Sequence, residues 1–233
     1  IEITDAYNSL VNFSFNHPEY SFPKINPVEK GISATQLAHP LLHPQKRVAN
    51  DFHIDNKEFF IVTGANMAGK STFLRTVSLQ IVMSNIGLPV CAENCQYTPI
   101  KLITSMRTSD SLNDDESYFF SELKRLKYIV NRIQQDRYFI ILDEILKGTN
   151  STDKANGSKK FVRKLVRSHS TGIIATHDLS LCEITAELPQ VKNHYFDAEI
   201  INDELHFDYR FKNGICQNMN ASFLLRKMEI VDE

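Results

Sequence analysis

Apolar side chains recur along the 233-residue chain at two different spacings, and the spacings predict its elements. Near the start they stand three or four positions apart, as in a helix, at Ile3, Ala6, Leu10 and Phe13. Pro18 should end this helix, because the residue before a proline is pushed out of the helical region. From 20 to 56 the pattern is irregular and rich in proline, so we expect short strands and loops there.

The middle of the chain alternates between short apolar runs and helical spacing. Three runs lack polar alternation and have the length of buried strands, namely 58–63, 138–142 and 171–176. Segments with helical spacing follow or separate them, namely 73–83, 117–133 and about 154–167. Strands of this kind with helices between them favour a parallel sheet covered on both faces, which places the chain in the α/β class.

The end of the chain follows a third pattern. Apolar residues alternate with polar ones at Leu205, Phe207, Tyr209 and Phe211. With Asn202 and Asp203 as the turn, this alternation predicts an antiparallel hairpin over 194–211, peripheral to the parallel sheet. A last helix is expected at about 220–228.

Composition supports one large folded domain, with or without an appendage. Hydrophobic residues make up 42% of the chain and include 15 Phe, which excludes a disordered chain. Lys and Arg number 26 against 28 Asp and Glu, and the net charge of -2 is unlike that of a stand-alone nucleic-acid-binding module. A DNA partner would therefore be contacted mainly by regions of a longer protein that are absent here.

The ends of the chain and its cysteines suggest an excised segment of a cytoplasmic protein. It begins at Ile1 without a Met or a signal-peptide pattern, and no apolar run approaches the roughly 18 residues of a membrane span. We expect no membrane contact of this segment. Cys91 and Cys95 could lie one helical turn apart, but four scattered cysteines are better interpreted as reduced thiols than as metal ligands.

Residues 64–71 read Gly-Ala-Asn-Met-Ala-Gly-Lys-Ser and fit the phosphate-binding pattern G-x-x-x-x-G-K-S/T. Glycines let backbone N–H groups turn toward phosphate oxygens, and the helix that follows directs its positive end at the anion. Lys70 would reach the β- and γ-phosphates, and the Ser71 hydroxyl would bind Mg²⁺. The alternative, a glycine turn with a surface lysine, does not account for the strand before the loop and the helix after it.

Three more residues with functional side chains stand at the ends of predicted strands. Asp143 and Glu144 follow the second strand, where an Asp can hold Mg²⁺ and a Glu can act as general base toward the attacking water. Because ligands of parallel sheets bind at the carboxyl ends of the strands, a purely solvated pair is the weaker interpretation. His177 ends the third strand and, beside such a loop, is a candidate sensor of the γ-phosphate.

Two helical segments are basic and amphipathic. The first carries Lys124, Arg125, Lys127 and Arg132, and the second carries Lys159, Lys160, Arg163, Lys164 and Arg167. Both could contact phosphates. The nearly neutral charge balance of the chain favours the simpler interpretation, solvated faces of amphipathic helices.

Several of these segments, in the same order, resemble the MutS family of mismatch-repair proteins. The loop 63–72 has the Asn-Met pair of that family, and 143–149 resembles its acidic strand end. The likeness continues in the loop 151–157, in the Ala-Thr-His of 175–177 and in 48–51, and it covers about 32 to 185. Ser117 stands where the family begins its signature helix, and a His-Pro pair at 39–40 is also similar.

The resemblance implies a P-loop NTPase of the ABC type that uses ATP and Mg²⁺ as a homodimer with composite sites. In such a site the partner's Ser117 would face the γ-phosphate, with Glu144, Lys70 and His177 as catalytic residues and Ser71 and Asp143 at the metal. It carries the nucleotide-binding role onto Gly64, Ala65, Asn66, Met67, Ala68, Gly69, Lys70, Ser71, Thr72, Val48 and Asn50. Residues 1–20 would be the base of a lever helix and 21–233 the ATPase domain.

Two departures from the family pattern and two other functions bear on this hypothesis. The signature reads Ser-Tyr-Phe-Phe rather than Ser-Thr-Phe-Met, and Lys147 replaces the usual Arg. One alternative is a nucleotide-binding dimerisation or regulatory module with little hydrolysis, which the intact Lys70, Asp143 and Glu144 disfavour. The other is a transporter-type ABC ATPase, which should have a Ser-Gly-Gly signature that 115–118 lacks.

Overall fold

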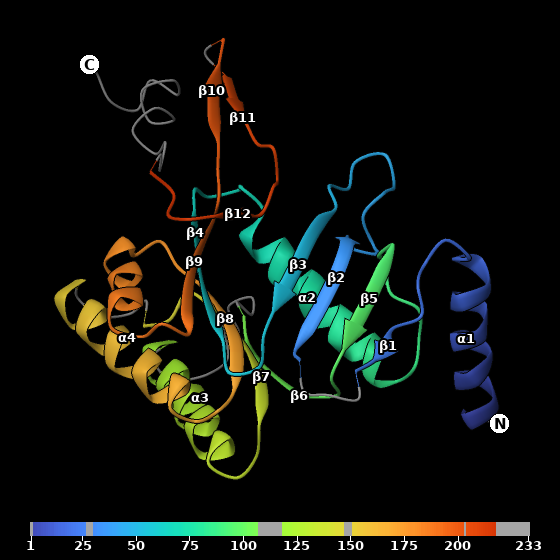
Figure 1. Cartoon of the computed structure of the whole chain (residues 1–233), viewed down its shortest axis with the longest axis horizontal. Helices are drawn as coiled ribbons and strands as arrows, with labels where there is room; N and C mark the ends of the chain where they lie inside the picture. Colours follow the sequence, from blue (N-terminus) through green and yellow to red (C-terminus); the bar gives the residue numbers. More distant parts are fainter. Residues whose placement is uncertain (1, 27–29, 107–117, 147–150, 203, 218–233) are drawn as a thin grey trace.

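The computed structural model describes residues 2–26, 30–106, 118–146, 151–202 and 204–217. At its centre is a six-stranded sheet in the order β12-β9-β4-β8-β7-β6, parallel except for the edge strand β12 (Figure 1). Its strands are β4 (Phe59–Gly64), β6 (Lys101–Ser105), β7 (Tyr138–Asp143), β8 (Thr171–Ala175), β9 (Val191–Phe196) and β12 (Lys212–Asn213). The three strands predicted from apolar runs are thus confirmed as β4, β7 and β8, and the structure places them next to one another in the order β4-β8-β7.

Helices cover both faces of this sheet, as the apolar runs predicted. α2 (Lys70–Asn85) packs on the face that carries Phe60 and Val62. α3 (Tyr118–Ile133), α4 (Ser151–Val166) and the 3₁₀ segment η1 (Leu179–Ala186) pack on the face that carries Phe59 and Ile61. Successive residues of a strand point to opposite faces, so β4 supplies apolar side chains to both cores.

A second sheet lies on the far side of α2 and buries that helix between two layers. Its order is β1-β5-β2-β3, antiparallel except for the β1–β5 pair. The strands are β1 (Lys24–Ile25), β2 (Ile32–Leu37), β3 (Asn50–Ile54) and β5 (Asn94–Tyr97). Ile32, Phe52 and Tyr97 join α2 in one hydrophobic cluster, which is why most of α2 is buried.

The first helix, α1 (Glu2–Asn16), ends before Pro18 as predicted and has no buried residue. A short stack of rings attaches its end to the rest of the chain. Ring centroids of Phe13 and His17 are 4.8 Å apart, and those of His17 and Tyr20 are 4.5 Å apart. Arg47 donates from Nη1 to the Tyr20 hydroxyl at 3.1 Å, so the stack is tied to the loop before β3.

The hairpin predicted over 194–211 is largely wrong. Only β10 (Glu199–Ile201) and β11 (Glu204–His206) form it, because 194–196 belong to β9, which pairs in parallel with β4. Phe207 and Phe211 do not pair across a strand; they pack against the cluster that contains α2. Burial of these two rings beside α2 therefore prevailed over the period-two pattern.

Two further expectations can be checked against the described residues. Cys91 and Cys95 are not one helical turn apart, since Cys95 lies in β5; all four cysteines are buried and free. Among the described helices, none is both long enough and apolar enough to cross a membrane. The helix expected at about 220–228 lies outside the described residues.

Candidate functional site

A glycine-bearing loop connects β4 to α2 at the carboxyl edge of the central sheet. Gly64 has φ 146°, and a Cβ there would lie 2.3 Å from the carbonyl oxygen of Phe196. Gly69, with φ 106°, stands immediately before the first residue of α2. Only glycine accommodates both the close approach and the left-handed backbone, so the glycine spacing read in the sequence is a requirement of this turn.

Lys70, the first residue of α2, is buried inside the loop. Its Nζ donates to the carbonyl oxygens of Gly64 at 2.7 Å and Ala65 at 2.9 Å. A lysine is rarely buried unless its charge is satisfied. The ammonium is therefore fixed at the N-terminus of a helix, where the helix dipole adds positive potential.

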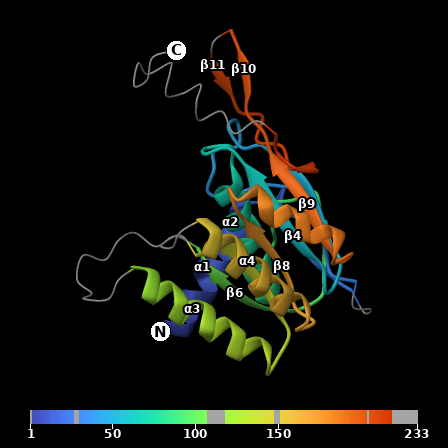
Figure 2. The ribbon, with the colours of Figure 1, turned by 90° about the vertical axis from the view of Figure 1, so that its left-hand side faces the viewer.

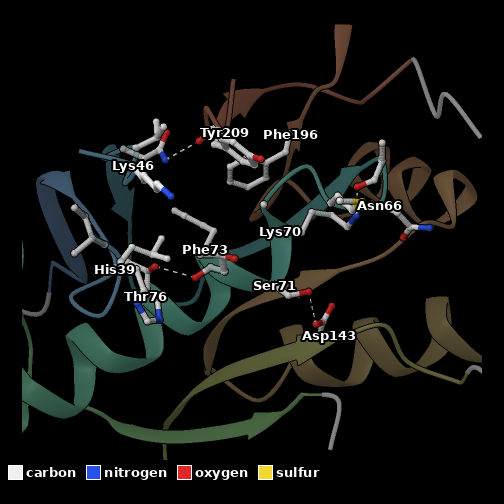
Figure 3. Close-up of a pocket in the computed structure, with 18 of the residues that line it drawn as sticks. His39, Lys46, Asn66, Lys70, Ser71, Phe73, Thr76, Asp143, Phe196 and Tyr209 are labelled. Atoms are coloured by element: carbon white, nitrogen blue, oxygen red, sulfur yellow. Dashed lines mark hydrogen bonds between the residues drawn. The ribbon is translucent and has the colours of Figure 1, made fainter. Parts of the chain in front are cut away.

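Ser71 and Asp143 meet across two elements that are 72 positions apart in the chain. The Ser71 Oγ donates to the Oδ2 of Asp143 at 2.7 Å, which joins the first turn of α2 to the end of β7 (Figure 3). A hydroxyl and a carboxylate are hard oxygen ligands of the kind that Mg²⁺ prefers. Among the described residues, no three His, Cys, Asp or Glu side chains gather as a metal site.

Glu144 and His177 form a second pair beside the first. The Nε2 of His177 lies 2.8 Å from the Oε1 of Glu144. Glu144 has φ 53°, a left-handed conformation that costs a non-glycine residue about 1 kcal/mol. Its N–H donates to the carbonyl oxygen of Ala175 at 2.9 Å, which fixes the turn against the end of β8.

These side chains line one end of a cavity of about 680 Å³. Asn66 and Met67 at the tip of the loop are exposed at its rim, and Met67 has φ 65°. Gly69, Lys70, Ser71 and Thr72 line the same end with Asp143, Glu144 and His177. Gly64 and the buried Ala68 shape the loop without lining the cavity. Ser117 lies outside the described residues.

The other end of the cavity is built from segments far apart in the chain. Figure 3 shows Lys46, His39, Thr76 and Phe73 at this end, with Tyr209 above them. The sequence indicated Val48 and Asn50 here, and both line the cavity. Burial and the nearby charge of Arg75 lower the pKa of His39.

Asn50 has a definite partner at this end. Its Nδ2 donates to the carbonyl oxygen of Tyr209 at 3.0 Å, and its Oδ1 accepts from the N–H of Phe211 at 2.8 Å. Tyr209 has φ 53°, and its Cδ1 would lie 3.1 Å from a Cβ on Gly69. The amide of Asn50 thus holds the Tyr209 segment over the loop.

Tyr209, Phe196, Lys46 and His39 were not read from the sequence as site residues. The alternation over 205–211 indicated that Tyr209 belonged to an ordered segment, but it suggested pairing with another strand rather than contact with the loop. Nothing in the sequence relates position 209 to position 50.

The described fold defines the class: a mixed α/β protein with a mainly parallel sheet flanked by helices and a glycine-rich loop at its carboxyl edge. The sequence model of the family described as MutS domain V matches residues 60–228. The chain belongs to this family.

Curated relatives agree with this membership. The chain is 30% identical over 200 residues to human MutS protein homolog 4, covering 81% of this chain and 21% of that protein. It is 28% identical over 218 residues to DNA mismatch repair protein MutS of Thermotoga maritima, covering 91% and 26%. It is 28% identical over 243 residues to DNA mismatch repair protein MSH4 of Arabidopsis thaliana, covering 97% and 30%. The chain therefore spans about a fifth to a third of these relatives.

Proposed function

We propose that this chain is an Mg²⁺-dependent ATPase domain of the P-loop, ABC type. The observation that carries the proposal is that Lys70, Ser71, Asp143 and Glu144 meet at one end of a cavity large enough for a nucleotide. Few other ligands call for a helix N-terminus, a buried lysine and two strand-end carboxylates in one place.

The phosphates of ATP would lie against the loop 64–72. Their oxygens would replace the carbonyl oxygens of Gly64 and Ala65 as acceptors for Lys70, whose charge is already placed there. The N–H groups at the start of α2 would add further donors. Lys70 thus binds the phosphates and offsets the charge that develops on them.

Ser71 and Asp143 are the residues that would hold Mg²⁺. Their oxygens are 2.7 Å apart and both residues line the cavity, and the remaining ligands would be water and phosphate oxygens, as is usual for Mg²⁺. The ion would supply charge neutralisation at the β- and γ-phosphates.

Glu144 would accept the proton of the attacking water, and His177 would hold the carboxylate and read the γ-phosphate. The 2.8 Å contact between them keeps the Glu144 side chain at the cavity rather than in solvent. Its left-handed backbone supports the same interpretation, because strained residues cluster at functional sites.

The base of the nucleotide would occupy the end lined by Val48, Phe73 and Tyr209. Tyr209 is 42% exposed, and an aromatic residue that is partly exposed at a cavity wall is suited to stacking on a purine. Asn50 would act there by holding Tyr209 in place, because its side-chain amide already donates to the carbonyl oxygen of Tyr209.

Family membership supports a proposal about the assembly and about the longer protein. We propose a homodimer with composite sites, each completed by the partner's Ser117, within a longer MutS-like protein that binds DNA through regions outside this chain. Residues 1–20 would transmit the state of the site and 21–233 would form the ATPase domain. The Arg47–Tyr20 contact supports this route, because Lys46 and Val48, on either side of Arg47, line the cavity.

Glu144→Gln tests the proposal. It should lower ATP hydrolysis by about 100-fold or more while preserving ATP binding, since only the proton acceptor is lost. Glu187→Gln is the matched control, because Glu187 pairs with Arg163 on the opposite side of the sheet from α2. Sedimentation of Glu144→Gln with Mg-ATP should show a dimer that is absent with ADP.

Two outcomes would contradict it. A wild-type hydrolysis rate that Glu144→Gln does not change would favour the regulatory module instead. A monomer under every condition, with ATP bound, would contradict a composite site closed by this chain.

A further inference from the structure

The outer surfaces of α3 and α4 carry a set of cations that the nucleotide site does not use. Along α3, four residues stand four positions apart on the solvent side, namely Phe120, Lys124, Tyr128 and Arg132. Residues at this spacing share one face of a helix and follow one another at about 6 Å. The only acidic residue of α3, Glu122, points inward and accepts from the N–H of Leu146 at 2.5 Å.

Aromatic rings hold these cations in place. The Nζ of Lys124 lies 5.0 Å from the ring centroid of Phe120. The Cζ atoms of Arg125 and Arg132 lie 5.2 and 5.6 Å from the ring centroid of Tyr128. The two contacts with Tyr128 reduce the freedom of the Arg125 and Arg132 side chains without neutralising their charge. The exposed part of α3 therefore carries a positive stripe made of Arg125, Lys127 and Arg132.

α4 carries two rows of cations with different partners. The row nearer η1 is neutralised, since Lys159 pairs with Glu183 and Arg163 with Glu187, each at 2.7 Å. The outer row consists of the exposed Lys160, Lys164 and Arg167. Within the described part of the chain, none of these three has a carboxylate at ion-pair distance.

The two helices lie side by side on the same face of the central sheet. Figure 2 shows them together in front of the strands, and their inner side chains share one hydrophobic cluster. The α3 stripe and the outer row of α4 therefore form one surface, here called the α3–α4 face: Arg125, Lys127, Arg132, Lys160, Lys164 and Arg167. Six cations gather on one face of a chain whose net charge is -2.

We propose that the α3–α4 face binds the phosphate backbone of duplex DNA without regard to sequence. A row of cations opposite a phosphate backbone gains free energy by releasing the counterions of the nucleic acid. The rings of Phe120 and Tyr128 already carry cations on their faces, so they are poorly placed to stack on the unpaired bases of a single strand. This contact is separate from the nucleotide site and is additional to DNA contacts made by the rest of a longer protein.

The test is fluorescence anisotropy of a labelled mixed-sequence duplex with the 233-residue chain at several salt concentrations. The face variant combines Arg132→Gln, Lys160→Gln and Lys164→Gln. The control variant combines Lys24→Gln, Lys30→Gln and Lys57→Gln, which remove the same charge from exposed positions outside α3 and α4. Melting temperature and ATP binding of both variants should match those of the unchanged chain.

The face variant should bind the duplex about tenfold more weakly or worse, with the same loss for any sequence. The slope of log affinity against log salt should become shallower by roughly 3, about one for each phosphate contact removed. The control variant should change neither quantity as much.

Three results would overturn the proposal. Equal losses in the two variants would mean that only net charge acts. Tighter binding to a single strand of the same sequence would contradict a duplex surface. Binding to vesicles containing phosphatidylserine, with no binding to the duplex, would assign the face to anionic lipid instead.

Discussion

The two ends of the cavity are built in different ways. The phosphate end is formed mainly by the continuous segment from Gly64 to Thr72, with Asp143 and Glu144 added from the end of β7, which β8 separates from β4 in the sheet. The base end is assembled from 39–50, from Phe73 and Thr76 on α2, and from Tyr209 near the end of the described chain. A local turn thus fixes the first, whereas the second depends on long-range packing, so substitutions should affect them separately.

Lys70→Ala should have the largest effect and should act on the phosphate end alone. Loss of a buried cation and its charge-assisted hydrogen bonds should cost about 3 kcal/mol, or about 100-fold in affinity for ATP and for tripolyphosphate. Isothermal titration calorimetry with each ligand measures both. Lys46→Ala, at the base end, should change tripolyphosphate binding much less, and an equal loss would contradict the division into two ends.

Falling pH should destabilise the folded chain at His194, which packs beneath the base end of the cavity through Phe211. His194 on β9 is 6% exposed and stacks on Phe211 with centroids 4.5 Å apart, and burial lowers its pKa to about 4. Between about pH 6.5 and 4 the unfolded chain binds a proton at His194 and the folded chain does not. The free energy of unfolding therefore falls as the pH falls.

The loss attributable to His194 should reach about 3 kcal/mol by pH 4. Urea unfolding across this range measures it, and the pH dependence should flatten in His194→Phe, whereas the exposed His53→Phe should retain it. Equal pH dependence in the two variants would show that other groups are responsible.

Asn50→Ala should lower the affinity for adenosine nucleotides by about tenfold, through the base end of the cavity. The substitution leaves the carbonyl oxygen of Tyr209 and the N–H of Phe211 without their partner, which costs about 1–3 kcal/mol in holding that segment. Affinity for adenosine nucleotides should fall while affinity for tripolyphosphate stays constant. His53→Ala, an exposed position on the same strand, is the matched control, and a fall in tripolyphosphate affinity would show that the two ends are not independent.

Tyr209→Ala should have the smallest effect, about fivefold in ATP affinity, because one stacking ring is worth about 1 kcal/mol. Tyr209→Phe should preserve the affinity, since the ring rather than the hydroxyl makes the contact. A loss as large in Tyr209→Phe as in Tyr209→Ala would assign the contact to the hydroxyl.

The sequence by itself determined the three central strands of the sheet, the main helices that cover them and the phosphate end of the cavity. Buried parallel strands must be apolar along their whole length, so β4, β7 and β8 could be read directly. Gly64 and Gly69 are required by the turn that they occupy, and Asp143, Glu144 and His177 stand at strand ends that a parallel sheet brings to one edge. Local geometry and one topological rule suffice for these features.

Only the tertiary structure decided how the base end is assembled and which cations of the surface are left without a carboxylate. The contact of Asn50 with Tyr209 spans 159 positions, and the period-two pattern over 205–211 indicated a strand that the packing of Phe207 and Phe211 excluded. Whether a cation of α4 is neutralised depends on η1 and the residue after it, because Glu183 and Glu187 pair with one row and the other row is left to solvent. Such features depend on contacts between residues far apart in the chain, whereas the spacing of apolar residues reports only on neighbours along the chain.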